Sequence, residues 1–206
     1  MKTTGNQTKN IIFDLGGVLI DWNPRYLYRK LLPEDQVEWF LREVCDSEWN
    51  EQQDAGRSFK DAIEIKAKEF PNHRSLIEAY FQRWQEMLGD AIHGTVEIFD
   101  TLDRQGWPLY ALSNWSAETF HHAEGRFEFL GRFKGRVVSG FEGVKKPDRK
   151  IFELLSNRFK INPQESLFID DVEKNVRAAS EYGFQTIQFQ DPKALLRELK
   201  GRGIIS

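Results

Sequence analysis

The decisive stretch of the sequence spans residues 11–20 and reads IIFDLGGVLI. It is a short apolar run that ends in Asp14, with Gly16 and Gly17 following closely. Such a run indicates a buried parallel strand that leads into a tight turn. The glycines allow positive φ angles and a close approach of the backbone to a ligand. Asp14 therefore stands where a carboxylate can act as a nucleophile or a metal ligand, although a turn or helix-capping role fits its position as well.

Three further apolar runs also end in polar residues, and a fourth, weaker run lies near the C-terminal end. They are residues 107–112, followed by Ser113 and Asn114; residues 137–138, followed by Ser139 and Gly140; residues 167–169, followed by Asp170 and Asp171; and residues 186–189. Helical patterns separate these runs, and strands that alternate with helices predict a βαβ series. The expected fold class is α/β, with a doubly wound, Rossmann-like parallel sheet. Ligands bind at the carboxyl ends of such strands, so we expect Asp14 and these polar residues to converge there.

Residues 22–89, called the cap segment below, interrupt this alternation. They show helical stripes and no convincing strand. We therefore expect an α/β core from residues 1–21 and 90–206, with residues 22–89 as an all-helical cap over the site. Three of its aromatic residues either line the site or pack inside the cap: Trp22, Tyr26 and Trp49. Three of its cations either meet a second anionic group or are solvated: Arg25, Arg29 and Arg57.

Composition narrows the function classes. The chain has 206 residues, a net charge of −3 and one cysteine, Cys45, in a helical apolar pattern. The basic residues are spread along the chain, which argues against a nucleic-acid partner held by charge. One cysteine excludes an intrachain disulfide and a cysteine-rich metal site. The polar N-terminal stretch and the lack of a run of roughly 20 apolar residues predict a soluble, cytoplasmic protein with no membrane partner.

Other polar groups carry chemistry with Asp14. Asp170 and Asp171, side by side at the end of an apolar run, are costly beside a core unless a cation is present, and Mg²⁺ meets that need. A capping role for Asp171 fits the sequence too. Lys146, before Pro147, can balance carboxylates and a phosphate, or be a solvated surface lysine. Ser113 and its neighbour can donate hydrogen bonds to an anionic oxygen.

In this order the groups resemble the haloacid dehalogenase-like hydrolase superfamily. The motifs are Phe-Asp14-x-Gly-Gly17-Val-Leu, Leu-Ser113-Asn114, Lys146-Pro147 and Phe-Ile-Asp170-Asp171-x-x-x-Asn175. The resemblance is greatest to phosphatase-type members with a small helical cap placed after the first motif. It implies a Mg²⁺-dependent phosphatase of small phosphorylated metabolites, sugar phosphates among them, that works through an aspartyl phosphate.

The resemblance also implies a role for each residue. Asp14 is the expected nucleophile and a metal ligand. Ser113 and Asn114 are expected to hold the phosphoryl oxygens, Gly17 to border them, and Lys146 to neutralise charge on nucleophile and phosphate.

At the fourth motif the resemblance makes Asp171 the direct metal ligand. Asp170 is expected to act beside it through a metal-bound water, and Asn175 takes the place of a further acid of the family.

The sequence departs from the family pattern at Gly16, where phosphatases of the superfamily carry a second aspartate as general acid and base. The backbone carbonyl of Gly16 can still ligate the metal, but the proton-transfer role is lost, and that role is typically worth ~10²–10⁴-fold in rate. Asp21 is the nearest candidate replacement, and His121 and His122 are two others. A hinge or salt-bridge role for Asp21, and a packed or exposed role for the histidines, are the alternatives.

Two other functions remain open from the sequence. Haloacid dehalogenases of the superfamily also lack this aspartate and use no metal, although they lack the paired acids seen here at Asp170 and Asp171. A catalytically weak phosphate-binding or regulatory protein fits Gly16 but leaves the presence of Asp14 and Lys146 unexplained.

Overall fold

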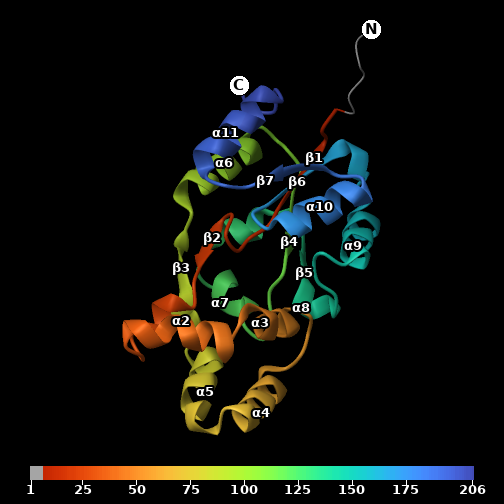
Figure 1. Cartoon of the computed structure of the whole chain (residues 1–206). Coiled ribbons are helices and arrows are strands. Elements are labelled where there is room, and N and C mark those ends of the chain that lie inside the picture. The colour runs from red at the N-terminus through yellow and green to blue at the C-terminus, as the bar shows by residue number, and fades with distance from the viewer. Residues whose placement is uncertain (1–6) are drawn as a thin grey trace.

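The structure is a computed structural model that describes residues 7–206. Its centre is a five-stranded parallel sheet with the strand order β5-β4-β1-β6-β7 (Figure 1). The strands are β1 (Asn10–Phe13), β4 (Leu109–Ser113), β5 (Gly135–Val138), β6 (Ser166–Asp170) and β7 (Gln185–Gln188). The order reverses direction at β1, so the prediction of a doubly wound parallel sheet is confirmed.

Helices cover both faces of this sheet, which is why its three central strands β4, β1 and β6 are mostly apolar. Ile11 and Phe13 point into the core on one face, and Ile12 points into the core on the other. The first face is covered by α6 (His93–Arg104) and α11 (Pro192–Gly201), the second by α9 (Arg149–Phe159) and α10 (Glu173–Tyr182). Shorter helices complete the core: α7 (Phe120–Glu124), η3 (Glu128–Arg132), α8 (Ser139–Glu142) and η4 (Pro163–Glu165). No helix of the described chain is long and apolar enough to cross a membrane.

The cap segment forms helices that lie beyond the carboxyl ends of the strands (Figure 1). They are α1 (Arg25–Tyr28), α2 (Glu34–Glu43), α3 (Ser47–Asp54), α4 (Phe59–Glu69), η1 (Pro71–His73), α5 (Arg74–Gln82) and η2 (Trp84–Met87). Asp46 and Ser58 cap α3 and α4 by accepting backbone N–H groups in the first turn of each helix. The rings of Trp49, Phe59 and Tyr80 pack against one another in the middle of these helices.

A two-stranded antiparallel ribbon joins the cap segment to the core. It consists of β2 (Ile20–Trp22) and β3 (Leu88–Ala91). The sequence analysis saw no convincing strand between residues 22 and 90, and that prediction was wrong for β3. Its sequence, LGDA, contains no β-branched or aromatic residue, so strand propensity does not reveal it. The ribbon fixes both ends of the cap segment side by side.

Ion pairs also tie the cap segment to the core. Glu51 of α3 accepts hydrogen bonds from Lys145 at 2.6 Å and from Lys174 at 2.7 Å. The two lysines belong to different core segments, and each stands next to a residue of the proposed site, Lys146 or Asn175. The backbone N–H of Phe59 donates to the carboxylate of Glu118 at 2.6 Å. The cap segment is therefore held over the strand ends by contacts on both sides.

Gly140, at the start of α8, provides a test of how tightly the core packs behind the site. A Cβ atom at this position would collide with the backbone nitrogen of Ala117 and lie 2.7 Å from the carbonyl oxygen of Trp115. We expect Gly140→Ala to lower the free energy of unfolding by about 1–3 kcal/mol, because backbone atoms cannot move aside as a side chain can. Urea unfolding measures this. Gly131→Ala is the control, since nothing lies within 4 Å of its added Cβ; equal losses in the two variants would contradict the prediction.

Candidate active site

Three neighbouring strands bring the polar residues of the motifs together. β1 lies between β4 and β6, with Phe13 beside Ala111 and Ile169. Asp14 follows β1 directly, while Ser113 and Asp170 are the last residues of β4 and β6. The carboxyl ends of parallel strands meet at one edge, so residues more than 150 positions apart in sequence share one site.

Lys146 is the centre of this site. Its side chain is fully buried, and its Nζ lies 2.9 Å from Oδ2 of Asp14 and 2.6 Å from Oδ2 of Asp170. Nζ also donates to the carbonyl oxygen of Leu112 at 2.9 Å. The three donors of the ammonium group are thus directed at three oxygen atoms from β4, β6 and the end of β1.

Asn114 holds the backbone of this lysine. The side-chain oxygen of Asn114 accepts the N–H of Lys146 at 2.8 Å, and its Nδ2 donates to the carbonyl oxygen of Lys146 at 3.0 Å. The amide therefore positions the lysine. Ser113 differs, because its buried Oγ has no hydrogen-bond partner among residues 7–206. An unpaired buried hydroxyl at a strand end is a donor available to a bound oxyanion.

The two acids that end β6 have different surroundings. Asp170 is fully buried and accepts hydrogen bonds from the backbone N–H of Val172 at 2.8 Å and from Nδ2 of Asn175 at 3.1 and 3.2 Å. Asp171 is more exposed and lines a cavity. Together with Lys146, these contacts occupy both oxygens of Asp170, whereas Asp171 is accessible to a ligand.

Oxygen atoms from Asp14, Asp170 and Asp171 lie within 4.8 Å of one another. Burial raises the pKa of Asp14 to about 8; Lys146 acts against this, and Asp170 adds to it. Burial and the charge of Asp170 also raise the pKa of Asp171. For Lys146 burial acts to lower the pKa, but Asp14 and Asp170 outweigh it and raise the pKa. Ionised together, three carboxylates and one ammonium carry two uncompensated negative charges, so the cluster suits a hard divalent cation with oxygen ligands such as Mg²⁺.

The glycine pair after Asp14 shapes the floor of the site. Gly17 has a φ of +75°, and a Cβ atom there would lie 2.5 Å from Oδ2 of Asp171, so only glycine fits. Gly16 has no such constraint: its φ lies outside the left-handed region, and nothing lies within 4 Å of an added Cβ. The N–H of Leu15 donates to Oδ1 of Asp14 at 2.6 Å and orients this carboxylate.

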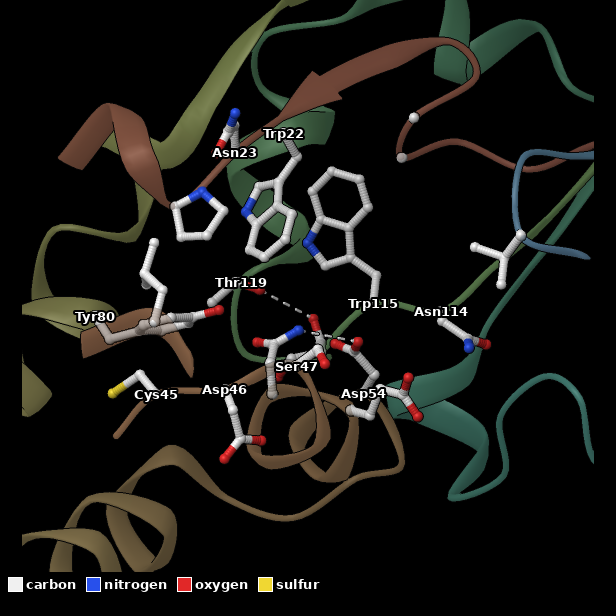
Figure 2. Close-up of a pocket in the computed structure, with 18 of the residues that line it drawn as sticks. Trp22, Asn23, Cys45, Asp46, Ser47, Asp54, Tyr80, Asn114, Trp115 and Thr119 are labelled. Atoms are coloured by element: carbon white, nitrogen blue, oxygen red, sulfur yellow. Dashed lines mark hydrogen bonds between the residues drawn. The ribbon is translucent and has the colours of Figure 1, made fainter. Parts of the chain in front are cut away.

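A cavity of about 910 Å³ opens between the strand ends and the cap segment. Asp14, Gly16, Gly17, Asn114 and Asp171 lie at its core end. Trp22, Asp54 and Tyr80 line it from the cap side, and Trp115 from the loop after β4 (Figure 2).

Asp54 and Trp115 were missed in the sequence analysis. Asp54 ends α3 and accepts a hydrogen bond from Nδ2 of Asn50 at 3.2 Å. Burial raises the pKa of Asp54 to about 7; the charge of Glu51 adds to this increase, and the charge of Lys145 acts against it. In sequence Asp54 is one of many acids on a polar helix, so no local signal marks it. Trp115 directly follows Ser113 and Asn114, and that position was the available signal.

The candidates to replace the acid that is missing at position 16 lie outside the cavity lining. Asp21 accepts a hydrogen bond from the hydroxyl of Tyr26 at 2.5 Å and is not among the residues that line the cavity. His122 stacks on Trp84, with 5.7 Å between ring centres, and the ring of His121 lies tilted against that of His122. Cys45 is buried, as expected, and borders the cavity.

The aromatic residues and arginines that were predicted candidates in the cap segment have different surroundings. Trp22 lines the cavity, whereas Trp49 is buried in the core of the cap segment. Arg25 is paired with Glu38 at 2.6 Å, and Arg29 with Glu34 at 3.0 Å. Arg57 donates to the side chain of Gln53 at 2.7 Å.

The family model for haloacid dehalogenase-like hydrolases matches residues 8–183. The chain therefore belongs to this family of hydrolases, and the prediction from its motifs is confirmed.

Among curated relatives, the sesquiterpene phosphatase astK of Aspergillus oryzae is 29% identical over 93% of this chain and 95% of its own length. A structure described as a predicted HAD-like family hydrolase from Porphyromonas gingivalis is 26% identical, with a TM-score of 0.69 over 94% of this chain and 98% of that chain. A HAD family enzyme from Bacteroides thetaiotaomicron, crystallised with magnesium and inorganic phosphate, has a TM-score of 0.67 at 24% identity, over 89% of this chain and 95% of its own. The last similarity shows the shared fold.

The raised pKa of Asp54 makes stability depend on pH. Its folded-state pKa of about 7 lies above the unfolded value, so the native state binds this proton more tightly and loses stability as the pH rises between the two values. We expect Asp54→Asn to reduce the drop in unfolding free energy between pH 5 and pH 8 by on the order of 1–3 kcal/mol. Urea unfolding at the two pH values measures this. The exposed control Asp35→Asn should leave the drop unchanged, and an unchanged drop in Asp54→Asn as well would show that Asp54 is ionised throughout.

Proposed function

We propose that the protein is a Mg²⁺-dependent phosphatase of small phosphorylated metabolites that works through an aspartyl phosphate on Asp14. The observation that carries the proposal is the contact of Asp14 with the buried ammonium group of Lys146, inside a cluster of three carboxylates. An aspartate nucleophile needs a nearby positive charge to approach a phosphate dianion. The name of the Aspergillus oryzae relative, a phosphatase that matches nearly the whole chain, supports the same reaction class.

In this proposal each group of the site has a separate role. Oδ2 of Asp14 is held by Lys146, and Oδ1 is held by the N–H of Leu15, which orients the carboxylate at the cavity. The unpartnered hydroxyl of Ser113 donates to a phosphoryl oxygen, while Asn114 fixes the backbone of Lys146. Asp14, Asp171 and the carbonyl of Gly16 would hold Mg²⁺, with Asp170 behind them. A cation held there would supply positive charge next to the phosphoryl oxygens.

Lys146 stabilises the transferring phosphoryl group by its fixed position. Because it is already held by three oxygens, it needs little reorganisation as negative charge develops beside it. The cap segment closes the cavity above and would exclude water from the aspartyl phosphate until hydrolysis. Dehalogenation remains the alternative, but the acid pair at the end of β6 favours a cation-dependent reaction.

The test of this proposal is phosphate release from a panel of esters and acyl phosphates that includes acetyl phosphate. We expect release with Mg²⁺, none with EDTA, and a loss of at least ~10³-fold in Asp14→Asn, because the nucleophile is removed. The exposed α2 variant Asp35→Asn serves as the control and should keep full activity. Release that persists in Asp14→Asn would refute the aspartyl-phosphate route, and halide release from 2-haloacids in its place would establish the dehalogenase.

Gly16 predicts a second kinetic feature. With no general base beside Asp14, hydrolysis of the aspartyl phosphate should be slower than its formation from a good leaving group. We expect a burst of about one equivalent of para-nitrophenol per enzyme from para-nitrophenyl phosphate, followed by slow turnover. Gly16→Asp fits without strain, and we expect it to raise the steady rate by ~10²-fold and abolish the burst. Gly16→Asn is the control of equal size. If both variants behave as the wild type, proton transfer at this position does not limit the rate.

A further inference from the structure

The cavity above Asp14 has an aromatic wall, which we define as Trp22, Phe59, Tyr80, Trp84 and Trp115. All five line the cavity, and they come from β2, α4, α5, η2 and the loop after β4. The rings of Trp84 and Trp115 lie 5.4 Å apart, and Figure 2 shows Trp22 and Trp115 side by side above Asp54. Leu41 and Cys45 add further apolar surface. A group that leaves Asp14 toward the cap therefore meets an aromatic wall on one side and polar residues of α3 such as Ser47 and Asn50 on another.

The size of the cavity adds to this. A volume of about 910 Å³ is in the upper part of the range for drug-sized ligands. A phosphate group with a three-carbon body would leave most of the aromatic wall without contacts. Burial of apolar surface is the main source of affinity in such a cavity, so the wall favours a large apolar body.

The charges around the cavity exclude a second anionic group. Its cations on the cap side and on α10 are already engaged: Arg25 with Glu38 at 2.6 Å, Arg42 with Glu43 at 2.7 Å, and Lys174 with Glu51 at 2.7 Å. Asp46 and Asp54 line the cavity as well. A second phosphate or a carboxylate on the substrate would lie near these acids and would find no free cation among the residues described. Because like charges repel each other, such a substrate would bind weakly.

Two donors in the wall lack acceptors. The indole Nε1 atoms of Trp22 and Trp115 are both buried, and neither has a hydrogen-bond partner between residues 7 and 206. Trp115 as a whole is only 5% exposed. A buried donor without an acceptor is costly, and an uncharged oxygen on a bound molecule would relieve that cost.

From these observations we infer that the substrate is the phosphate monoester of an uncharged, mostly apolar alcohol, with a bulky body against the aromatic wall and a hydroxyl, ether or carbonyl oxygen near the two indoles. This inference rests on the proposed phosphatase function and names its substrate class. It predicts a lower kcat/KM for polyol and sugar phosphates than for apolar esters, and it excludes bisphosphates and phosphorylated acids as good substrates.

The first experiment uses para-alkylphenyl phosphates, from methyl through butyl to octyl, because their phenols leave with nearly equal acidity. Buried methylenes each contribute about a fourfold factor when fully transferred, so we expect kcat/KM to rise by about 10–50-fold from methyl to butyl. The kcat/KM of para-carboxyphenyl phosphate should be at least ~10-fold lower than that of para-methylphenyl phosphate, although its phenol is more acidic and leaves more readily. The kcat/KM of ribitol 5-phosphate should be lower than that of para-butylphenyl phosphate.

The second experiment assigns the preference to the wall. Trp22→Ala should reduce the butyl-to-methyl ratio of kcat/KM to about threefold or less, because the lost ring is part of the surface that the alkyl chain covers. A ratio between two substrates is unaffected if part of the variant is unfolded. Trp22→Leu should give an intermediate ratio, and this milder change keeps the test usable if the alanine variant does not fold. Trp39→Ala is the control, since Trp39 is an exposed α2 residue outside the cavity and should leave the ratio unchanged.

The outcomes separate the two proposals. No phosphate release that depends on Asp14 from any ester would overturn the phosphatase function itself. Release with a flat alkyl series, or a ratio that Trp22→Ala leaves intact, would overturn the substrate class and keep the phosphatase. Rapid hydrolysis of the carboxyphenyl ester would also overturn it, because a second negative charge would then be tolerated.

Discussion

The ammonium group of Lys146, buried between Asp14 and Asp170, is the interaction on which the rest of the structure depends. It joins the end of β1, the end of β6 and the carbonyl of Leu112 in β4 at one point. A buried charge is tolerated only when its partners satisfy it fully, and removal of one partner from such a group costs about 3–5 kcal/mol. The strand order, the backbone hold by Asn114 and the placement of Asn175 therefore all serve one cluster. When its three carboxylates are ionised, the same cluster carries an excess of negative charge at the cavity, which suits a divalent cation.

The core and the cap segment contribute different kinds of groups to the cavity. The core supplies buried charged groups that are paired with one another, while the cap segment supplies most of the aromatic wall. Glu51 connects the two, because its carboxylate binds lysines that neighbour Lys146 and Asn175. Both ion pairs are partly exposed, so each contributes little to the stability of the contact between the cap segment and the core.

The sequence predicted the core of the fold and the central site, because apolar runs ending in Asp14, Ser113 and Asp170 carry a local signal. It did not reveal β3, whose stability comes from its pairing with β2 and not from its own residues. It could not show that Asn114 supports a lysine, or that Asp54 faces the same cavity as Asp14, since both depend on contacts between distant segments. The position of Asp21 beside Tyr26, outside the cavity lining, likewise depends on packing and not on its distance along the chain. Local pattern gives strands and their ends, whereas packing decides which side chains meet.

Gly16 and the aromatic wall have to be considered together. In the proposed reaction Gly16 offers no side chain for proton transfer beside Asp14, while the Asp14–Lys146 contact and the acid cluster are intact. An enzyme in that condition depends more on whatever else lowers the barrier. Binding energy from a part of the substrate remote from the reaction can be used to hold the phosphoryl group in line with Asp14. A large apolar body against Trp22 and Trp115 would supply such energy, whereas a small polar body would not. Under the proposed function, the missing side chain at Gly16 and the large aromatic cavity are therefore consistent features of one site, in which positioning would supply most of the catalysis.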